Sequence, residues 1–121
     1  MSSSNIEDLR LTLSRTRAAL VQLAARSEEQ IVYLQDLGVG NSADELALEL
    51  REGVLMLDQL QKESLVREEQ IEAIVALDRK LGQMSGPGRA HLWTWNALER
   101  SDEWKEVRAL ASEALATFDK L

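Results

Sequence analysis

The positions of glycine and proline constrain the fold of this chain more than any other feature. Its 121 residues include one proline and six glycines, and all of these except Gly53 fall within residues 38–40 and 82–88. The segments between them are rich in Leu, Ala, Glu, Gln and Arg, which favour helix. No long segment alternates apolar and polar residues as a half-buried strand does. The sequence therefore predicts an all-α fold with loops at the two clusters.

The first segment carries one apolar stripe, because apolar residues recur at spacings of three and four from Ile6 to Leu34. A capping-box pattern at Ser4–Glu7 predicts that the helix begins near Asn5. The same spacing recurs at Ser27–Gln30. Two interpretations follow: a continuous helix over residues 5–37, or a break near Ser27. No glycine or proline lies in the interval, so we favour the continuous helix.

The second segment, residues 43–81, begins after a further capping-box pattern at Ser42–Glu45 and has near-heptad apolar spacing. It forms either one long helix or two helices hinged near Lys62 to Leu65. A short loop between two long helices favours an antiparallel hairpin. Gly53 lies inside the helical pattern, where glycine is unfavourable, and we expect it to mark a close helix crossing.

The last part begins with a loop at residues 82–88, which is followed by an aromatic-rich segment over residues 90–98. A final helix begins after Ser101, with Asp102 and Glu103 in its first turn, where they favour the helix dipole. We expect this helix to close the hairpin. The prediction is a single domain, residues 1–121, folded as a bundle of three to five helices built on a long antiparallel helical hairpin.

Composition argues against several classes of function. The formal net charge of −7 disfavours nucleic-acid binding, which needs a basic surface. No apolar run is long enough to span a membrane, and residues 1–5 lack the features of a secretory signal. The absence of cysteine fits a cytoplasmic protein. With His91 as the only histidine and no motif of a nucleophile or a phosphate loop, we expect no catalytic residues, no metal site and no cofactor, so the protein is not expected to be an enzyme.

Acidic residues concentrate in the middle of the chain. Residues 41–82 hold ten acids and five bases, a net of −5, whereas the segments on either side each have a net of −1. Like charges also recur at helical spacing, in two sets: Glu45, Glu49 and Glu52, and Glu68 and Glu72. Such pairs are slightly destabilising in a helix. They form either an acidic surface for a basic partner or a solvated face partly neutralised by Arg51, Lys62 and Arg67.

The three tryptophans form a second unusual cluster, because Trp93, Trp95 and Trp104 fall within twelve positions. Trp93 and Trp95 are two residues apart and would point to nearly opposite faces of a helix. In one interpretation Trp93 is exposed and anchors a partner. In the other, Trp95 and Trp104 close the end of the bundle and Trp93 packs under the loop.

A group of residues near the C-terminus resembles the C-terminal segments of small helical bacterial proteins, some of them immunity proteins of polymorphic-toxin or contact-dependent inhibition systems. The resemblance covers about a quarter of the chain and rests on Met84-Ser85-Gly86, Leu92-Trp93-Thr94, Ala97-Leu98, Ser101, Glu103-Trp104, Val107-Arg108 and Leu110-Ala111. It implies a small, cytoplasmic, cofactor-free protein that blocks a toxin by tight binding, with an acidic surface where the toxin is basic.

Two functions remain open. In the first, the protein is a small acidic module that binds a basic protein, of the immunity type, through Glu45, Glu49, Glu52, Glu68, Glu72 and Trp93. In the second, it is a homo-oligomeric structural or assembly protein. Its apolar stripes would exceed what one C-terminal helix covers, and a homodimer would bury the remainder.

Overall fold

The computed structural model describes residues 3–119, with side chains from residue 5, and every regular element in this range is a helix. The elements are α1 (Ser3–Ala24), α2 (Ser27–Leu37), α3 (Asp44–Leu55), α4 (Leu57–Lys62), α5 (Glu68–Gln83), the short 3₁₀ helix η1 (Ala90–Trp93), α6 (Trp95–Arg100) and α7 (Asp102–Asp119). The prediction of an all-α chain is confirmed for the described residues.

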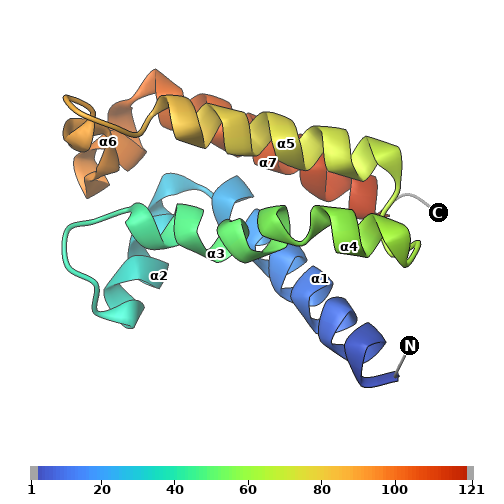
Figure 1. Ribbon diagram of the computed structural model, residues 1–121. Coiled ribbons are helices and arrows are strands. Elements are labelled where there is room, and N and C mark those ends of the chain that lie inside the picture. Colours follow the sequence, from blue (N-terminus) through green and yellow to red (C-terminus); the bar gives the residue numbers. More distant parts are fainter. Residues whose placement is uncertain (1–2, 120–121) are drawn as a thin grey trace.

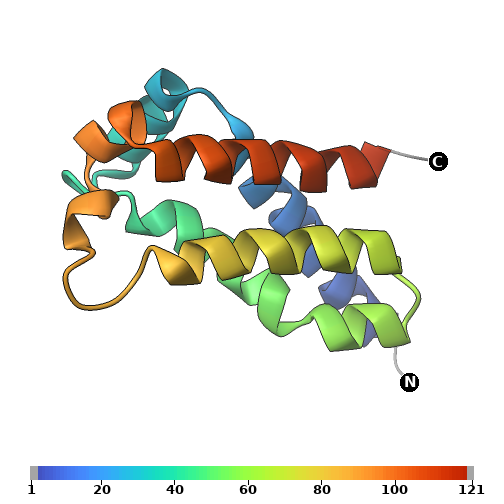
Figure 2. The ribbon, with the colours of Figure 1, turned by 90° about the horizontal axis from the view of Figure 1, so that it is seen from above.

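The two longest helices, α1 and α7, pack against each other. Helices α5 and α7 lie side by side, and α3 and α4 follow one another beneath α5 (Figure 1). Helix α1 packs against both α3 and α7, and the view from above shows it crossing beneath α5 and α7 (Figure 2). Helices α2 and α6 pack together at the end of the molecule that also carries the loop after α5.

The apolar stripes expected from the sequence converge on one core. The largest side chain that is fully buried belongs to Trp104 of α7. Leucines from α1, α2, α3, α4 and α6 surround this core, together with Ile74 and Leu77 of α5. Burial of this kind stabilises a fold by roughly 25 cal/mol per Å² of apolar surface. The helical spacing of apolar residues therefore identified the buried faces correctly.

The continuous helix over residues 5–37 is wrong, because the chain bends at Ala25 and Arg26 between α1 and α2. Gln30 of α2 explains how a bend forms without glycine or proline. Its side chain is fully buried, and its amide donates to the carbonyl oxygens of Gln22 and Leu23, each at 3.1 Å. Carbonyls at a helix end need such donors. A side chain from the next helix thus takes over the role that a continued helix would have filled.

The second long segment also bends, and at two points. The expected hinge near Lys62 to Leu65 is present between α4 and α5, where Ser64 has a positive φ of 58°. A further break at Met56 separates α3 from α4. These breaks explain why the described residues form seven α-helices rather than three to five. Gly82, expected in the loop, lies in the last turn of α5.

Of the N-terminal caps predicted from the sequence, one forms and one does not. Ser101 caps α7 as expected, because its hydroxyl accepts a 3.2 Å hydrogen bond from the Trp104 amide. The capping box at Ser42–Glu45 does not form: α3 begins one residue later, after Ala43, and the Ser42 hydroxyl accepts from the amide of Asp44 at 3.2 Å. The box at Ser4–Glu7 involves a side chain outside the described residues.

Gly53 marks a close crossing between α1 and α3, as expected. A Cβ atom at this position would lie 2.0 Å from the Thr16 hydroxyl oxygen and 2.8 Å from its methyl carbon. Thr16 is itself buried, and its hydroxyl donates to the carbonyl of Thr12 at 2.7 Å. The α1 helix can approach α3 this closely only because residue 53 has no side chain.

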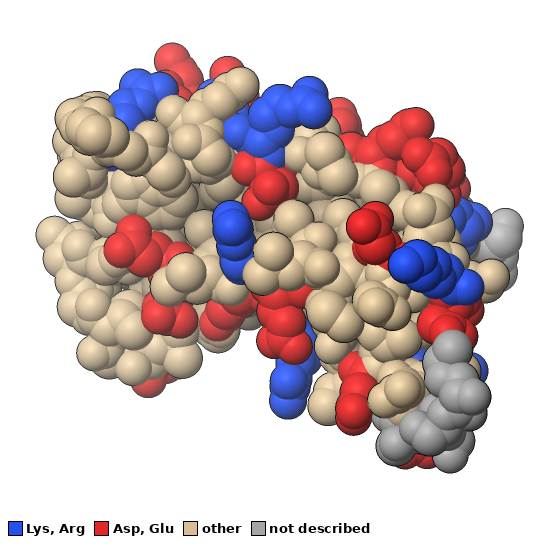
Figure 3. Space-filling view, in the orientation of Figure 1, with Lys and Arg blue, Asp and Glu red and all other residues tan. Residues whose placement is uncertain are grey.

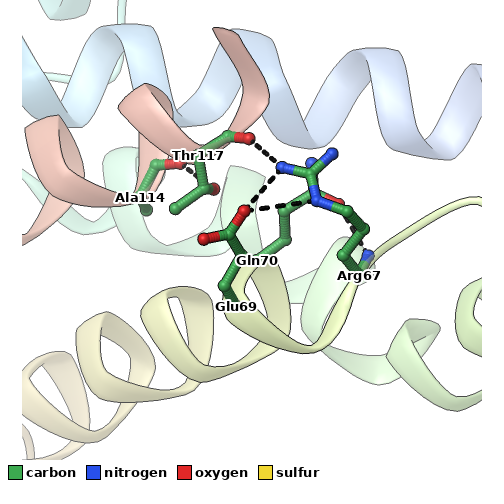
Figure 4. Close-up of polar contacts among 5 residues, drawn as sticks. All are labelled: Arg67, Glu69, Gln70, Ala114 and Thr117. Carbon is green, nitrogen blue, oxygen red and sulfur yellow. Dashed lines mark hydrogen bonds and ion pairs between the residues drawn. The ribbon is translucent and has the colours of Figure 1, made fainter. Parts of the chain in front are cut away.

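Arg67 joins the start of α5 to the end of α7 (Figure 4). Its guanidinium donates to the carbonyl oxygen of Thr117 at 2.6 Å and pairs with Glu69 at 2.9 Å. The Arg67 amide donates to the side-chain oxygen of Gln70 at 2.7 Å. The cation expected to neutralise the acidic face is therefore engaged with a helix terminus and with Glu69, rather than with Glu68 or Glu72.

Candidate protein-binding surface

Three of the four acidic residues of α3, Glu45, Glu49 and Glu52, lie toward α1 and α2. Glu49 is half-buried and accepts a hydrogen bond from the hydroxyl of Tyr33 in α2. Glu52 is exposed and accepts a long hydrogen bond, 3.5 Å, from Thr12 in α1. Glu45 is half-buried one turn before Glu49. The helical spacing thus placed these three carboxylates correctly on one face, but that face adjoins two other helices instead of standing alone.

A hollow of ≈ 400 Å³ separates the acidic face of α3 from α1. It is lined by Ala18, Ala19 and Gln22 of α1, by Tyr33, and by Glu49 and Glu52, with Arg15 as the one basic residue. The small alanine side chains leave this space open. The outline of the molecule is indented between α2 and the N-terminal half of α1, and both acidic and basic groups lie at the indentation (Figure 3).

The environment of Tyr33 is electrostatically negative. Partial burial, the hydrogen bond to Glu49 and the charges of Glu49 and Glu45 together raise the pKa of Tyr33 to about 12. A tyrosinate at this position would lose solvation and would face two carboxylates, so the neutral phenol is favoured. The hollow therefore presents a hydrogen-bonded phenol beside a group of negative charges.

Glu68 and Glu72 lie apart from the α3 group. Both are exposed on α5, which begins at the right-hand end of the molecule in Figure 1, whereas α3 begins at the left. Glu68 accepts a 3.0 Å hydrogen bond from the Gln61 side chain. Figure 3 shows acidic groups over this end of α5 as well. The structure thus places the five glutamates in two separate acidic areas.

None of the five glutamates forms an ion pair with any cation among residues 5–119. The ion pairs found there join Arg17 to Asp119, Arg26 to Glu29, Arg67 to Glu69, Lys80 to Glu106 and Lys105 to Asp102. The like-charge spacing on α3 and α5 is therefore not compensated by ion pairing within the described chain.

The tryptophans are held by the fold. The indole of Trp104 is buried and donates to the Leu92 carbonyl at 2.6 Å. Trp93 is half-buried, meets Trp104 edge to face with ring centroids 5.4 Å apart, and donates to the Met84 carbonyl at 2.8 Å. Trp93 thus packs under the loop after α5, and one side of it lines a separate hollow of ≈ 580 Å³.

Trp95 carries the one buried side-chain polar atom without a hydrogen bond among the described side chains, its indole nitrogen. Its backbone amide is satisfied by the side chain of Asn41 at 2.9 Å. This contact links α6 to the loop between α2 and α3, so the aromatic segment connects the C-terminal part of the chain to the N-terminal part.

The remaining features concern catalysis, metal binding and membrane insertion. His91 is exposed in η1. Across the described residues, no three His, Asp or Glu side chains come together in a way that would hold a metal ion. No helix in this range combines the length and apolar character needed to cross a membrane.

Sequence reasoning missed the acidic residues of α2 that face the same region. Glu28, Val32 and Asp36 are spaced i, i+4 and i+8, so they share one face of α2. All three line a second hollow between α1 and α2. The pattern that could have predicted this surface is an apolar residue, Val32, with an acid one turn before it and another one turn after it.

Comparison of the chain with protein families, curated proteins and solved structures yields no match.

Proposed function

We propose that this protein is a binding module that acts by associating with a basic protein, and that it is of the immunity type, neutralising a toxin by tight binding. The observation that carries the proposal is the absence of ion pairs, among the described residues, to Glu45, Glu49, Glu52, Glu68 and Glu72. Unpaired carboxylates on a rigid scaffold attract a partner of opposite charge and speed its association.

The geometry supports binding more than catalysis. The carboxylates of α3 adjoin a hollow with apolar alanines and a phenol, which is the mixture of apolar centre and polar rim found in protein interfaces. His91 is exposed, and no hydrogen bond of its side chain to a described residue is found. Trp93 would contribute through the part of its ring that lines the neighbouring hollow.

For the fold, we propose a bundle built on an antiparallel hairpin of α1 and α3. Two features support it: α1 packs along α3 with a close crossing at Gly53, and α7 packs against α1 and α5. The bend that separates α2 shortens the hairpin relative to the one expected from the sequence.

The proposed function is tested by capture and charge neutralisation. The tagged chain is incubated with native cell extract at low salt, and the expected result is a stoichiometric basic protein that dissociates as salt is raised. With that protein purified, the combined variant Glu45→Gln, Glu49→Gln and Glu52→Gln should bind it at least tenfold more weakly. Glutamine keeps an acceptor for Tyr33 and Thr12, so the fold is preserved.

A matched control removes the same charge elsewhere. Asp58→Asn, Glu99→Gln and Glu113→Gln change three exposed acids outside the α3 group. This variant should bind within about twofold of the unmodified chain at moderate salt, where distant charges are screened. Equal weakening by both variants would show that net charge, and not the α3 surface, governs the association.

Self-association is the second candidate function. It is favoured by Leu48 and Leu55, which are seven residues apart on α3 and 60% and 67% exposed. Exposed apolar residues on one helical face are suited to a homodimer or a larger assembly. Sedimentation that shows a defined multimer, together with recovery of the tagged chain alone from extract, would favour this function over the first.

A further inference from the structure

The hollow beside Glu49 and Glu52 adjoins a second hollow between α1 and α2. The second has a volume of ≈ 450 Å³, and both are lined by Gln22 and Tyr33. We take the two adjacent hollows, which extend over α1, α2 and α3, together as the acidic groove. Its position follows from the bend at Ala25 and Arg26, because a straight helix would place α2 beyond α1 instead of beside it.

The second hollow has an apolar lining that solvent reaches. Val32 of α2 is 54% exposed and Val21 of α1 is 40% exposed, and Ala25 lies at the bend between them. Both valines lie outside the apolar stripe of their helix that packs into the core. Two exposed valines in a hollow provide an apolar contact surface that no described residue packs over.

Negative charge surrounds this apolar lining. Five carboxylates line the acidic groove, and Arg15 is the only base among its lining residues. The carboxylates are Glu28, Glu29, Asp36, Glu49 and Glu52. Glu29 pairs with Arg26, but both side chains are largely exposed, and exposed pairs contribute little and exchange readily.

We propose that the acidic groove binds an amphipathic helix of the partner, with small apolar side chains on one face and Lys or Arg beside them. This rests on the proposed function and assigns it a surface. Apolar residues spaced three and four apart would contact Val21 and Val32, and the flanking cations would meet the carboxylates. The lining charge decides against other occupants: a second copy of this acidic chain and an anionic membrane would both be repelled.

The hollow beside Trp93 is less suited to this partner. Its charged lining residues are one acid, Asp44, and one base, Arg89, so it has no net charge with which to select a basic segment. The basic helix is therefore assigned to the acidic groove, and the Trp93 hollow would contact another part of the partner.

The probe is a synthetic 17-residue helical peptide with Leu and Ala on one face and Lys on the other. It is titrated into the isotope-labelled full chain, and amide chemical shifts are followed by two-dimensional NMR. Shifts concentrated at residues 18–25 and 28–36, with an affinity that falls as salt rises, are expected. A peptide of the same length with Glu in place of Lys should produce none. Shifts centred on Glu68 and Glu72 or on residues 84–94, or no shifts at millimolar peptide, would overturn the proposal.

Substitution of the apolar lining provides the second test. Val21→Ser with Val32→Ser should weaken peptide binding at least tenfold, because the apolar contact is lost while the charge is kept. Leu48→Ser with Leu55→Ser is the matched control, since these leucines are more exposed than the two valines but lie outside the acidic groove, and it should bind within about twofold. Equal affinity of the valine variant and the unmodified chain would refute the groove.

The variant with Val21→Ser and Val32→Ser also distinguishes an error in the assigned surface from an error in the proposed function. If the valine variant still captures a basic protein from extract as well as the unmodified chain does, the chain is a binding module and the acidic groove is not its surface. If the unmodified chain captures no partner and binds no peptide, both proposals fall.

Discussion

Helices α1 and α3 meet in two different ways within a few residues. At Thr16 and Gly53 the two backbones approach so closely that a single added carbon would overlap the threonine. Two and three residues further along α1, Ala18 and Ala19 line a hollow of ≈ 400 Å³ together with Glu49 and Glu52. The same pair of helices is thus closely packed on one side and open on the other.

The difference shows that small residues have two opposite effects here: one allows close packing of two helices, and the other leaves a hollow between them. At Gly53 the missing side chain brings the helices together, and the space is filled by backbone and by Thr16. Ala18 and Ala19 of α1 instead border a hollow, which solvent occupies or a partner fills. A small residue at a helix interface therefore has to be interpreted from the separation of the helices around it.

The largest effect is expected from Gln30→Ala, which would break the bend that places α2 beside the hollow. Gln30 donates to two carbonyls at the end of α1 and accepts from Arg108 at 3.2 Å, all at a fully buried position. Removing its amide deprives these groups of a buried partner and opens a cavity, although the Gln22 carbonyl keeps the Ala25 amide and Arg108 keeps the Leu98 carbonyl. The unfolding free energy should fall by about 3 kcal/mol. Chemical denaturation monitored by circular dichroism measures this.

The matched control for that variant is Gln35→Ala, in the same helix but exposed. Its unfolding free energy should change by less than about 0.5 kcal/mol. A similar loss in both variants would mean that the helical propensity of α2, and not the buried contacts of Gln30, maintains the bend.

An intermediate effect is expected on the packed side, from Gly53→Ala. Alanine favours helix by up to about 1 kcal/mol over glycine, but the new Cβ would overlap Thr16, and such overpacking costs about 1–3 kcal/mol. A net loss of about 1–2 kcal/mol is predicted, and replacing Thr16 by Ala in the same chain should recover part of it. Thermal unfolding by calorimetry would show both.

Gly82→Ala sharpens this prediction, because Gly82 also lies in a helix yet nothing stands within 4 Å of a Cβ placed there. Alanine should stabilise at this position by about 0.5–1 kcal/mol. Opposite signs at the two glycines would confirm that separation between helices decides the outcome. The same sign at both would contradict the close crossing.

The smallest effect is expected on the open side, from the pair formed by Tyr33 and Glu49. Tyr33→Phe removes one hydrogen bond and should lower the unfolding free energy by about 1 kcal/mol. The pKa of Tyr33 is raised to about 12 against an unfolded value of 10.0, so the unfolded chain loses its proton first. This contribution is therefore complete below pH 10 and is lost as the pH rises from 10 to 12.

Tyr33 is the only tyrosine in the sequence, so its absorbance change on ionisation can be assigned without ambiguity. Glu49→Gln should lower the pKa toward 10, although burial keeps part of the elevation. A midpoint near 10 in the unmodified chain would show that Tyr33 is solvated and that the hollow is wider than described.

Much of the architecture could be predicted from local pattern. The apolar spacing identified the buried faces of α1, α3, α5 and α7, and the clusters of glycine marked the C-terminal end of α2 and the loop after α5. Gly53 was recognised as a crossing because glycine inside a helix is unfavourable without a packing reason. The acidic face of α3 followed from spacing alone, since residues 45, 49 and 52 share a side of any helix.

The parts that could not be predicted all depend on contacts between distant residues. Ser27–Gln30 signalled a possible break, but the outcome depended on whether a buried donor could reach the last carbonyls of α1, and on Arg108 from the far end of the chain. The acidic residues of α2 belong to the candidate surface only because that bend places them beside α1, next to the hollow lined by Glu49 and Glu52.

By itself, the sequence determined that this chain is helical, which faces of its helices are buried and where its negative charge is concentrated. Helical propensity, periodicity and charge are properties of neighbouring residues, so they can be read along the chain. The tertiary structure alone decided where the long helices bend, and therefore which carboxylates and valines surround one groove. These depend on hydrogen bonds and close contacts between residues that only folding brings together.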